Sequence, residues 1–204
     1  MPPLVLGTTN RKKGAELAVL FGAAGVEIRT LADFADALDV EETGETFADN
    51  AALKATRQAR YLNQWVLGED SGLMVDALRG EPGVFSARYS GPGATDASNN
   101  ARLLAALGDT PVEKRAARYA CHMAIADPSG TIAAEVEEYC RGRILFEPRG
   151  SHGFGYDPLF ELVEYHGTFG QLGPTAKSVL SHRARAARRL VPKLIRLVDS
   201  GRWA

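Results

Sequence analysis

Near its N-terminus the chain reads Leu4-Val-Leu-Gly-Thr-Thr-Asn-Arg-Lys-Lys-Gly-Ala-Glu-Leu-Ala-Val-Leu-Phe21. The short apolar run stops at Gly7. After a polar turn the apolar residues recur at helical spacing, so this stretch predicts a strand, a turn and a helix. A turn at a helix N-terminus presents unpaired backbone N–H groups, and Lys12 and Lys13 add positive charge, which suits a phosphate chain. The alternative is an ordinary helix cap with exposed lysines, because the glycine spacing of a Walker A loop is missing.

Similar strand and helix patterns continue along the chain, and two extended runs around Asp127-Pro-Ser-Gly130 predict a hairpin. This mixture predicts an α/β fold with a mixed sheet, as one domain over residues 1–204 with two lobes and a cleft between them. Pro192 interrupts the apolar pattern of the last helix, so we expect a kink or two consecutive helices there. The remaining predicted elements are strands at 26–29 and 64–67, helices at 46–60 and 96–107, and a final helix capped by Ser181.

The composition is that of a globular protein without a strong overall charge. Hydrophobic residues make up 45% and charged residues 24%, and the net charge is −1. No global basic field therefore favours nucleic acid as a partner. The two cysteines, Cys121 and Cys140, match neither a disulfide framework nor a zinc motif, and no basic segment precedes a long apolar run. We expect a cytoplasmic protein with no membrane span.

Two adjacent acids, Glu41 and Glu42, precede a glycine at position 44. Paired carboxylates before a glycine turn can hold a hard cation such as Mg²⁺, and a solvated acidic loop is the alternative. Lys54 lies on the predicted helix at 46–60, four residues after Asn50. It faces either the same site or the solvent.

A second acidic pair, Glu69-Asp70, follows the predicted strand at 64–67 and precedes Ser71-Gly72. Carboxylates in that position are expected at the C-terminal edge of a sheet, where α/β proteins bind ligands. Asp70 could bind Mg²⁺ there or orient a water molecule for attack on phosphorus. An Asx turn, in which Asp70 bonds its own backbone, is the alternative.

A glycine-flanked aromatic loop reads Gly153-Phe-Gly-Tyr-Asp-Pro158. Phe154 has little to screen it on either side and can stack on a base. Asp157 would accept a hydrogen bond from a ring N–H or an exocyclic amine. The alternative is a tight loop whose aromatic rings pack inward.

A cluster of donors reads Lys177-Ser-Val-Leu-Ser-His-Arg183. Such side chains favour a ligand edge with carbonyl or phosphate oxygens, and they reject an edge that presents an amino group. The alternative is a solvated first helical turn, although basic groups there oppose the helix dipole.

Together, these strings resemble the inosine/xanthosine triphosphate pyrophosphatase family, whose members remove deaminated purine nucleotides. The resemblance covers Thr8 to Arg183, and its most specific strings are Gly153-Phe-Gly-Tyr-Asp-Pro158 and Ser181-His-Arg183. The other matching strings are Thr8-Thr-Asn10 with Lys13, Glu42-Thr-Gly44 with Asn50-Ala51, Asp70-Ser-Gly-Leu73, Pro82-Gly83 with Ser86-Ala-Arg-Tyr89, and Lys177.

The resemblance implies a homodimer whose elongated mixed β-sheet is flanked by helices, with two lobes around a central cleft. It also implies Mg²⁺-dependent hydrolysis of ITP, dITP or XTP to the monophosphate and pyrophosphate, which cleanses the nucleotide pool. Glu41 and Asp70 would bind the metal, and Asp70 would also be the base for the attacking water. The implied substrate-binding residues are Thr8, Thr9, Asn10, Arg11, Lys12 and Lys13 at the triphosphate, Lys54 and Ser71, Phe154, Gly155, Tyr156 and Asp157 at the base and sugar, and Lys177, His182 and Arg183 at the purine 6-oxo group.

Three features depart from the pattern of that family: Glu69 stands where many members have an aspartate, Thr175-Ala176 stands where they often have acids, and Pro192 interrupts the last helix. One alternative keeps the reaction but changes the base, as in a pyrophosphatase for other modified nucleotides. Another is a non-catalytic nucleotide- or RNA-binding module that uses the basic C-terminal helix. The near-neutral net charge and the acids at 41, 42, 69 and 70 oppose that alternative.

Overall fold

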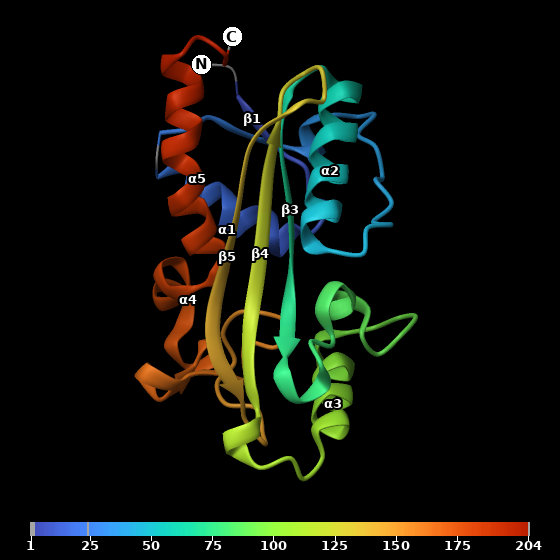
Figure 1. Ribbon diagram of the computed structural model, residues 1–204, viewed down its shortest axis with the longest axis vertical. Coiled ribbons are helices and arrows are strands. Elements are labelled where there is room, and N and C mark those ends of the chain that lie inside the picture. Colours follow the sequence, from blue (N-terminus) through green and yellow to red (C-terminus); the bar gives the residue numbers. More distant parts are fainter. Residues whose placement is uncertain (1–2, 24, 204) are drawn as a thin grey trace. The chain divides into compact units, whose positions relative to one another are not determined.

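The computed structural model describes residues 3–23 and 25–203, and within them the strands form one mixed sheet (Figure 1). The strand order is β2-β1-β3-β4-β5-β6-β7. β1 runs parallel to β2 and β3, whereas β6 runs antiparallel to β5 and β7. The predicted α/β class is therefore confirmed. The strands are β1 Leu4–Leu6, β2 Ile28–Thr30, β3 Trp65–Val75, β4 Ala116–Ala126, β5 Ile132–Ile144, β6 Phe160–Leu162 and β7 Gly167–Thr168.

The helices flank this sheet, and the chain divides into two compact units. The first unit comprises Met1–Asp70, Cys121–Glu138 and Arg183–Ala204, and the second comprises Ser71–Ala120 and Tyr139–His182. β3, β4 and β5 contribute residues to both units. In the described part of the chain, none of the helices is long and apolar enough to cross a bilayer. The α-helices are α1 Arg11–Gly22, α2 Phe47–Leu62, α3 Asp96–Leu107, α4 Phe169–Leu180 and α5 His182–Asp199.

The core of the first unit follows the side-chain alternation of its strands. Leu4, Leu6 and Leu67 pack in one cluster with residues of α1 and α5, whereas Val5 and Val66 pack on the other face with the alanines of α2. Figure 1 shows α5 and α2 on opposite sides of these strands. Each face of the sheet is thus covered, which explains why the strands are apolar at nearly every position.

α2 lies unusually close to β3, because small residues meet at the contact. Ala51, Ala55 and Ala59 are fully buried. A Cβ atom on Gly68 would lie only 2.0 Å from the carbonyl oxygen of Ala51, so no larger residue fits at that position. The helix begins at Phe47 because the side chains of Thr46 and Asp49 cap each other's backbone N–H groups. This close packing brings polar residues of α2 to the level of the carboxylates on β3.

The second unit has its own apolar core, formed by residues from β3, α3, β4, β6 and α4. Its largest members include Leu73, Leu103, Tyr119, Phe160 and Phe169. The rings of Phe160 and Phe169 stack with 5.9 Å between their centroids. This core supports the loop that carries Phe154 and Asp157, because Tyr156 within the loop and Leu159 just after it belong to the same cluster.

Several sequence predictions need correction. β3 extends from Trp65 to Val75, so the Glu69-Asp70-Ser-Gly72 string lies inside this strand. It neither follows the end of the strand, as predicted, nor forms an Asx turn. α4 was missed, because glycines at 170 and 173 and Pro174 are poor helix formers, and Gly173 has a left-handed φ of 78° that breaks its helical geometry. We expected a kink or two consecutive helices at Pro192; α5 runs through Pro192 as one helix, which excludes two consecutive helices. The exposed position of Pro192 lets solvent satisfy the carbonyl that its missing N–H leaves unpaired.

Candidate active site

Glu69 and Asp70 are consecutive in β3, and their side chains serve two different clusters of the first unit. Successive residues of an extended strand point to opposite faces of the sheet. Both residues are almost completely buried, with 0% and 4% of their surface exposed. A buried carboxylate is stable only when it is paired or hydrogen-bonded, so the partners of each one define its role.

The Asp70 carboxylate is bound by two residues of α2. Lys54 Nζ lies 3.2 Å from Asp70 Oδ1, and Asn50 Nδ2 donates to Asp70 Oδ2 at 3.3 Å. Burial raises the pKa of Asp70 above its ordinary value, although the positive charges of Lys54 and Lys13 oppose that rise. Burial alone would lower the pKa of Lys54, but the attraction of Asp70, Glu69 and Glu42 outweighs it and raises this pKa.

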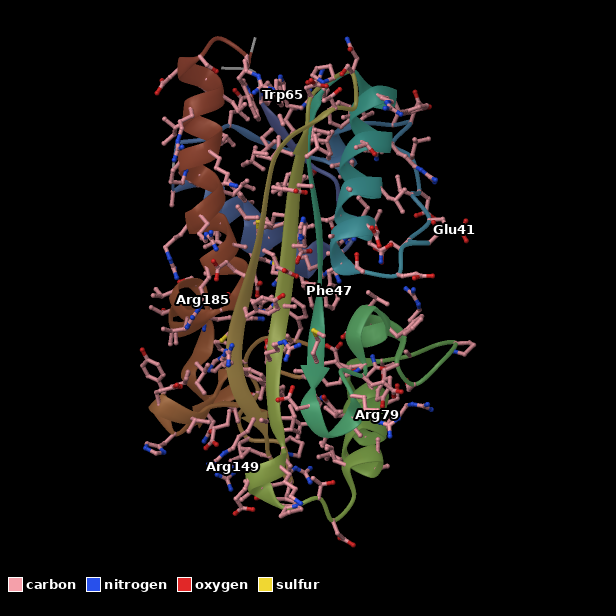
Figure 2. The ribbon with its side chains drawn as sticks, viewed as in Figure 1. Glu41, Phe47, Trp65, Arg79, Arg149 and Arg185 are labelled. Atoms are coloured by element: carbon pink, nitrogen blue, oxygen red, sulfur yellow. The ribbon has the colours of Figure 1, made fainter. Side chains whose placement is uncertain are left out.

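Lys54 also binds Glu42, so two carboxylates share one ammonium group. The distance from Lys54 Nζ to Glu42 Oε1 is 2.8 Å. Glu41 is exposed, and Figure 2 shows it on the outer side of the segment that precedes α2. The acid that the fold brings to Asp70 through Lys54 is therefore Glu42, the second member of the pair.

This carboxylate pair suits a hard divalent cation. Glu42 and Asp70 offer oxygen donors that already converge on a single positive charge, and Mg²⁺ in nucleotide sites is held by one or two carboxylates with water and phosphate oxygens completing the shell. Within residues 3–23 and 25–203, no group of three or more acidic, histidine or cysteine side chains is assembled as a complete metal cage. The donor set thus fits Mg²⁺ that is shared with a phosphate ligand.

The Glu69 carboxylate lies in the second cluster, where it binds two cations. Arg183 Nη2 is 3.0 Å from Glu69 Oε1, and Lys13 Nζ is 3.1 Å from Glu69 Oε2. Arg183 also binds Glu16 at 2.5 Å. Burial alone would lower the pKa of Arg183, yet Glu69 and Glu16 raise it, so this guanidinium stays charged. Arg183 is therefore engaged by carboxylates inside its own unit.

The turn before α1 caps that helix through Asn10. Asn10 Oδ1 accepts hydrogen bonds from the backbone N–H groups of Lys12 and Lys13 at 3.0 and 3.1 Å. Arg11 and Lys12 are exposed, whereas Lys13 is half-buried and points to Glu69. A cavity of about 630 Å³ opens beside this turn, and its polar lining includes Thr8, Thr9, Asn10, Arg11, Thr30 and Asp39.

The second unit gathers Phe154, Asp157 and Lys177. The backbone N–H of Phe154 donates to Asp157 Oδ2 at 2.9 Å, and Lys177 Nζ donates to the same oxygen at 2.5 Å. That ammonium group also lies 4.0 Å from the centroid of the half-buried Phe154 ring. Gly153 has φ of 79°, and a Cβ atom there would lie 2.1 Å from Asp157 Oδ2, so this turn requires glycine. The loop is thus organised around one buried carboxylate.

Two other aromatic residues of the second unit face inward. Tyr156 is 3% exposed, and its hydroxyl donates to the backbone carbonyl of Ser86 at 2.8 Å. Tyr119 donates to Asp157 Oδ1 at 3.4 Å, and its ring stacks on His182 with 4.7 Å between centroids. Gly155 accepts a hydrogen bond from Asn100 through its carbonyl, and Ser71 is half-buried. Phe154 is therefore the aromatic residue of this loop that remains accessible.

Sequence reasoning missed Glu16 and Tyr119, and it gave Asn50 no role although Asn50 belongs to the strings that carry the resemblance. Glu16 and Tyr119 lie in ordinary helix and strand patterns, and nothing local distinguishes them. Asn50 carried a usable signal, because it precedes Lys54 by one helical turn and so shares its face of α2. These partners bridge segments far apart in the sequence, which is why local patterns did not reveal them.

The fold and these contacts define an α/β protein with a mixed sheet whose buried carboxylates are matched to lysine and arginine side chains. The Ham1 family model matches residues 4–193. The chain belongs to the Ham1 family. This membership confirms the resemblance that the sequence strings indicated.

Known relatives match nearly the whole chain. A dITP/XTP pyrophosphatase of Rhodopirellula baltica is 51% identical over 197 residues, which cover 97% of this chain and 95% of that protein. Another, from Geobacillus kaustophilus, is 50% identical over 190 residues, covering 93% of each. The structure of a HAM1 protein from Coxiella burnetii has a TM-score of 0.87 at 35% identity and covers 96% of this chain and 100% of that one. A Mycobacterium abscessus nucleoside-triphosphatase / dITP/XTP pyrophosphatase has a TM-score of 0.75 at 40% identity, with coverages of 94% and 99%.

Proposed function

We propose that this protein hydrolyses deaminated purine nucleoside triphosphates, such as ITP, dITP and XTP, to the monophosphate and pyrophosphate. The observation that carries the proposal is the sharing of Lys54 by Glu42 and Asp70, which places two hard oxygen donors and one lysine together in the first unit. Relatives at 50% identity and above bear the name dITP/XTP pyrophosphatase. We also propose that the protein works as a cytoplasmic homodimer.

In this proposal Glu42 and Asp70 hold Mg²⁺, and Glu42 takes the role that the sequence had suggested for Glu41. The bound ion would neutralise phosphate oxygens as charge develops during P–O cleavage. Lys54 stays beside both carboxylates and keeps positive charge near the same phosphates. Lys13, at the start of α1, supplies a further charge that Glu69 holds in place.

Asp70 also suits the part of general base. Its raised pKa means that it takes up a proton more readily than an ordinary aspartate, which favours transfer from a water molecule to Asp70. Asn50 fixes one oxygen of the carboxylate by a hydrogen bond. The attacking oxygen then forms the new bond to phosphorus while the bond to the leaving pyrophosphate oxygen breaks, and Asp70 Oδ1 or Oδ2 carries the proton.

The second unit suits a purine base. Phe154 offers a half-buried ring for stacking, and the Lys177 ammonium close to that ring is a donor for the 6-oxo group of hypoxanthine or xanthine. Adenine presents an amino group at the same position, so a donor would face a donor and binding would weaken. Asp157 holds Lys177 in place, and His182 is fixed by its stacking on Tyr119.

The test is a substrate panel of ITP, XTP, GTP and ATP, with pyrophosphate and orthophosphate measured separately. The proposal expects pyrophosphate from ITP and XTP at rates at least about a hundredfold above that from ATP. Equal rates on all four nucleotides would retain a pyrophosphatase but discard the account of base selection. Nucleotide binding without release of either product would favour a non-catalytic binding module.

A further inference from the structure

One face of α2 carries a stripe of three buried polar side chains. Asn50, Lys54 and Gln58 recur every four residues, so they lie above one another on the same face of the helix. Their exposed fractions are 0%, 8% and 1%. Burial of such groups costs free energy unless each finds a partner. Their partners therefore show what the stripe does.

Each residue of the stripe binds a different point of the segment that precedes α2, in reverse order along the chain. Asn50 accepts from the backbone N–H of Gly44 at 2.8 Å, and Lys54 binds Glu42 at 2.8 Å. Gln58 binds Leu38 twice, because Leu38 N–H donates to Gln58 Oε1 at 3.1 Å and Gln58 Nε2 donates to the Leu38 carbonyl at 3.2 Å. Figure 1 shows this segment as the blue-to-cyan coil beside α2.

The segment from residue 34 to 46 contains no helix or strand. Its backbone therefore has no regular ladder to hold it, and side-chain contacts must fix its course. The Gln58 amide satisfies both backbone groups of Leu38, in the way that a neighbouring peptide group would. Leu38 lies four residues before Glu42, a span of at most about 14 Å of chain.

We propose that Gln58 is a positioning residue for Glu42, because its double hydrogen bond to Leu38 fixes the segment that delivers this carboxylate to Lys54 and Asp70. Gln58 acts through the backbone of the segment and touches neither Glu42 nor the reacting atoms. The inference rests on the proposed role of Glu42 in holding Mg²⁺. It predicts that loosening Leu38 weakens Mg²⁺ binding while the chemistry at saturating Mg²⁺ is preserved.

The test compares Gln58→Ala and Gln58→Glu with the control variant Thr56→Ala. Thr56 lies on the same helix, and its hydroxyl donates to the Ala52 carbonyl of that helix at 2.8 Å. Gln58→Glu keeps the size and the acceptor of the side chain, but an ionised carboxylate cannot donate to the Leu38 carbonyl. This variant also tests the double hydrogen bond to Leu38 if Gln58→Ala fails to fold.

Two readouts are measured for each variant. The first is the Mg²⁺ concentration that gives half-maximal pyrophosphate release from ITP, together with kcat at saturating Mg²⁺. Gln58→Ala should raise that concentration about tenfold with little change in kcat, and Gln58→Glu should raise it less. The second is hydrogen exchange across residues 38–44 in the metal-free protein, which should accelerate in both Gln58 variants and not in Thr56→Ala.

An unchanged Mg²⁺ requirement in both Gln58 variants would overturn the inference, even if their melting temperatures fall, because Gln58 would then have only a structural role. Unchanged exchange across residues 38–44 would overturn it independently. Wild-type protein that releases no pyrophosphate would instead defeat the proposed function, and the exchange experiment would still decide whether Gln58 holds the segment.

Discussion

Lys54 and Asp70 lie 3.2 Å apart, from Nζ to Oδ1, although one is on a helix and the other in the middle of a strand. Alanines on α2 and the glycine at position 68 of β3 make this approach close enough. Glu42 shares the same ammonium group at 2.8 Å. Lys54 therefore links α2 to β3 and to the segment that precedes α2.

Asp70→Asn should abolish turnover while keeping the fold. Loss of a general base lowers kcat by about 10²- to 10⁴-fold, and loss of a metal ligand adds to that effect. The variant should keep the fold at neutral pH, because it removes a buried carboxylate whose pKa burial raises, and Lys54 keeps Glu42 as a partner. Steady-state kinetics and thermal unfolding check both parts, and near wild-type turnover would remove Asp70 from the mechanism.

The stability difference between Asp70→Asn and wild type should depend on pH in a defined direction. The pKa of Asp70 is raised in the folded protein, so the protonated side chain favours folding relative to the ionised one. That contribution is fully present below the ordinary value of 3.8 and is lost as pH rises through the higher folded pKa. Unfolding curves should therefore coincide in acid and separate toward neutral pH, and a gap that widens in acid would contradict the account.

Lys54→Met should destabilise the protein by about 3 kcal/mol, because it leaves the buried Asp70 carboxylate without its cation. Mg²⁺ should restore part of this loss by binding the same carboxylates, so it should raise the melting temperature of the variant more than that of wild type. Calorimetric unfolding with and without Mg²⁺ provides the measurement. An equal response of both proteins to Mg²⁺ would place the ion elsewhere.

Glu42→Gln and Glu41→Gln form a matched pair of neighbouring, isosteric changes. The first removes a carboxylate that binds Lys54, and the second changes an exposed side chain. Glu42→Gln should raise the Mg²⁺ requirement by about tenfold or more, whereas Glu41→Gln should leave it unchanged. Mg²⁺ titrations of pyrophosphate release provide the measurement. A raised Mg²⁺ requirement in Glu41→Gln but not in Glu42→Gln would assign the metal to Glu41.

Lys177→Met should reduce the discrimination between ITP and ATP by about tenfold or more, because it removes the donor beside Phe154 while keeping a side chain of similar length. Arg183→Met is the informative comparison. Arg183 is held by Glu69 and Glu16, so its loss should act mainly on stability, at a cost of about 3 kcal/mol. The ratio of kcat/KM for ITP and ATP is the quantity to compare, and an unchanged ratio in Lys177→Met would mean that the base is read elsewhere.

Much of the fold follows from local sequence signals. α3 spans Asp96–Leu107 as predicted, since Thr95 caps its start and Gly108 ends it. β3 was underestimated because acidic, serine and glycine residues are poor strand formers. The strand continues through them because each buried carboxylate is paired on its own face of the sheet. Glu69 binds Lys13 and Arg183, and Asp70 binds Lys54 on the opposite face, and all three cations come from distant segments.

The candidate site was predictable as a set of motifs but not in its contacts. The donor and carboxylate strings were all visible, yet the choice between Glu41 and Glu42 depends on which side chain faces α2. Likewise, the sequence predicted that Arg183 reads a base but could not show that its guanidinium binds Glu16 and Glu69. Such pairings arise from long-range packing, which periodicity and caps do not encode.

The most direct measurement is the product of ITP hydrolysis by wild type and Glu42→Gln, with Mg²⁺ and with a chelator. We expect one pyrophosphate and one IMP per ITP with Mg²⁺ and neither product with the chelator. Glu42→Gln should recover activity only at higher Mg²⁺ concentrations. Release of orthophosphate, or chelator-resistant release of pyrophosphate, would contradict the carboxylate-held metal at the centre of the account.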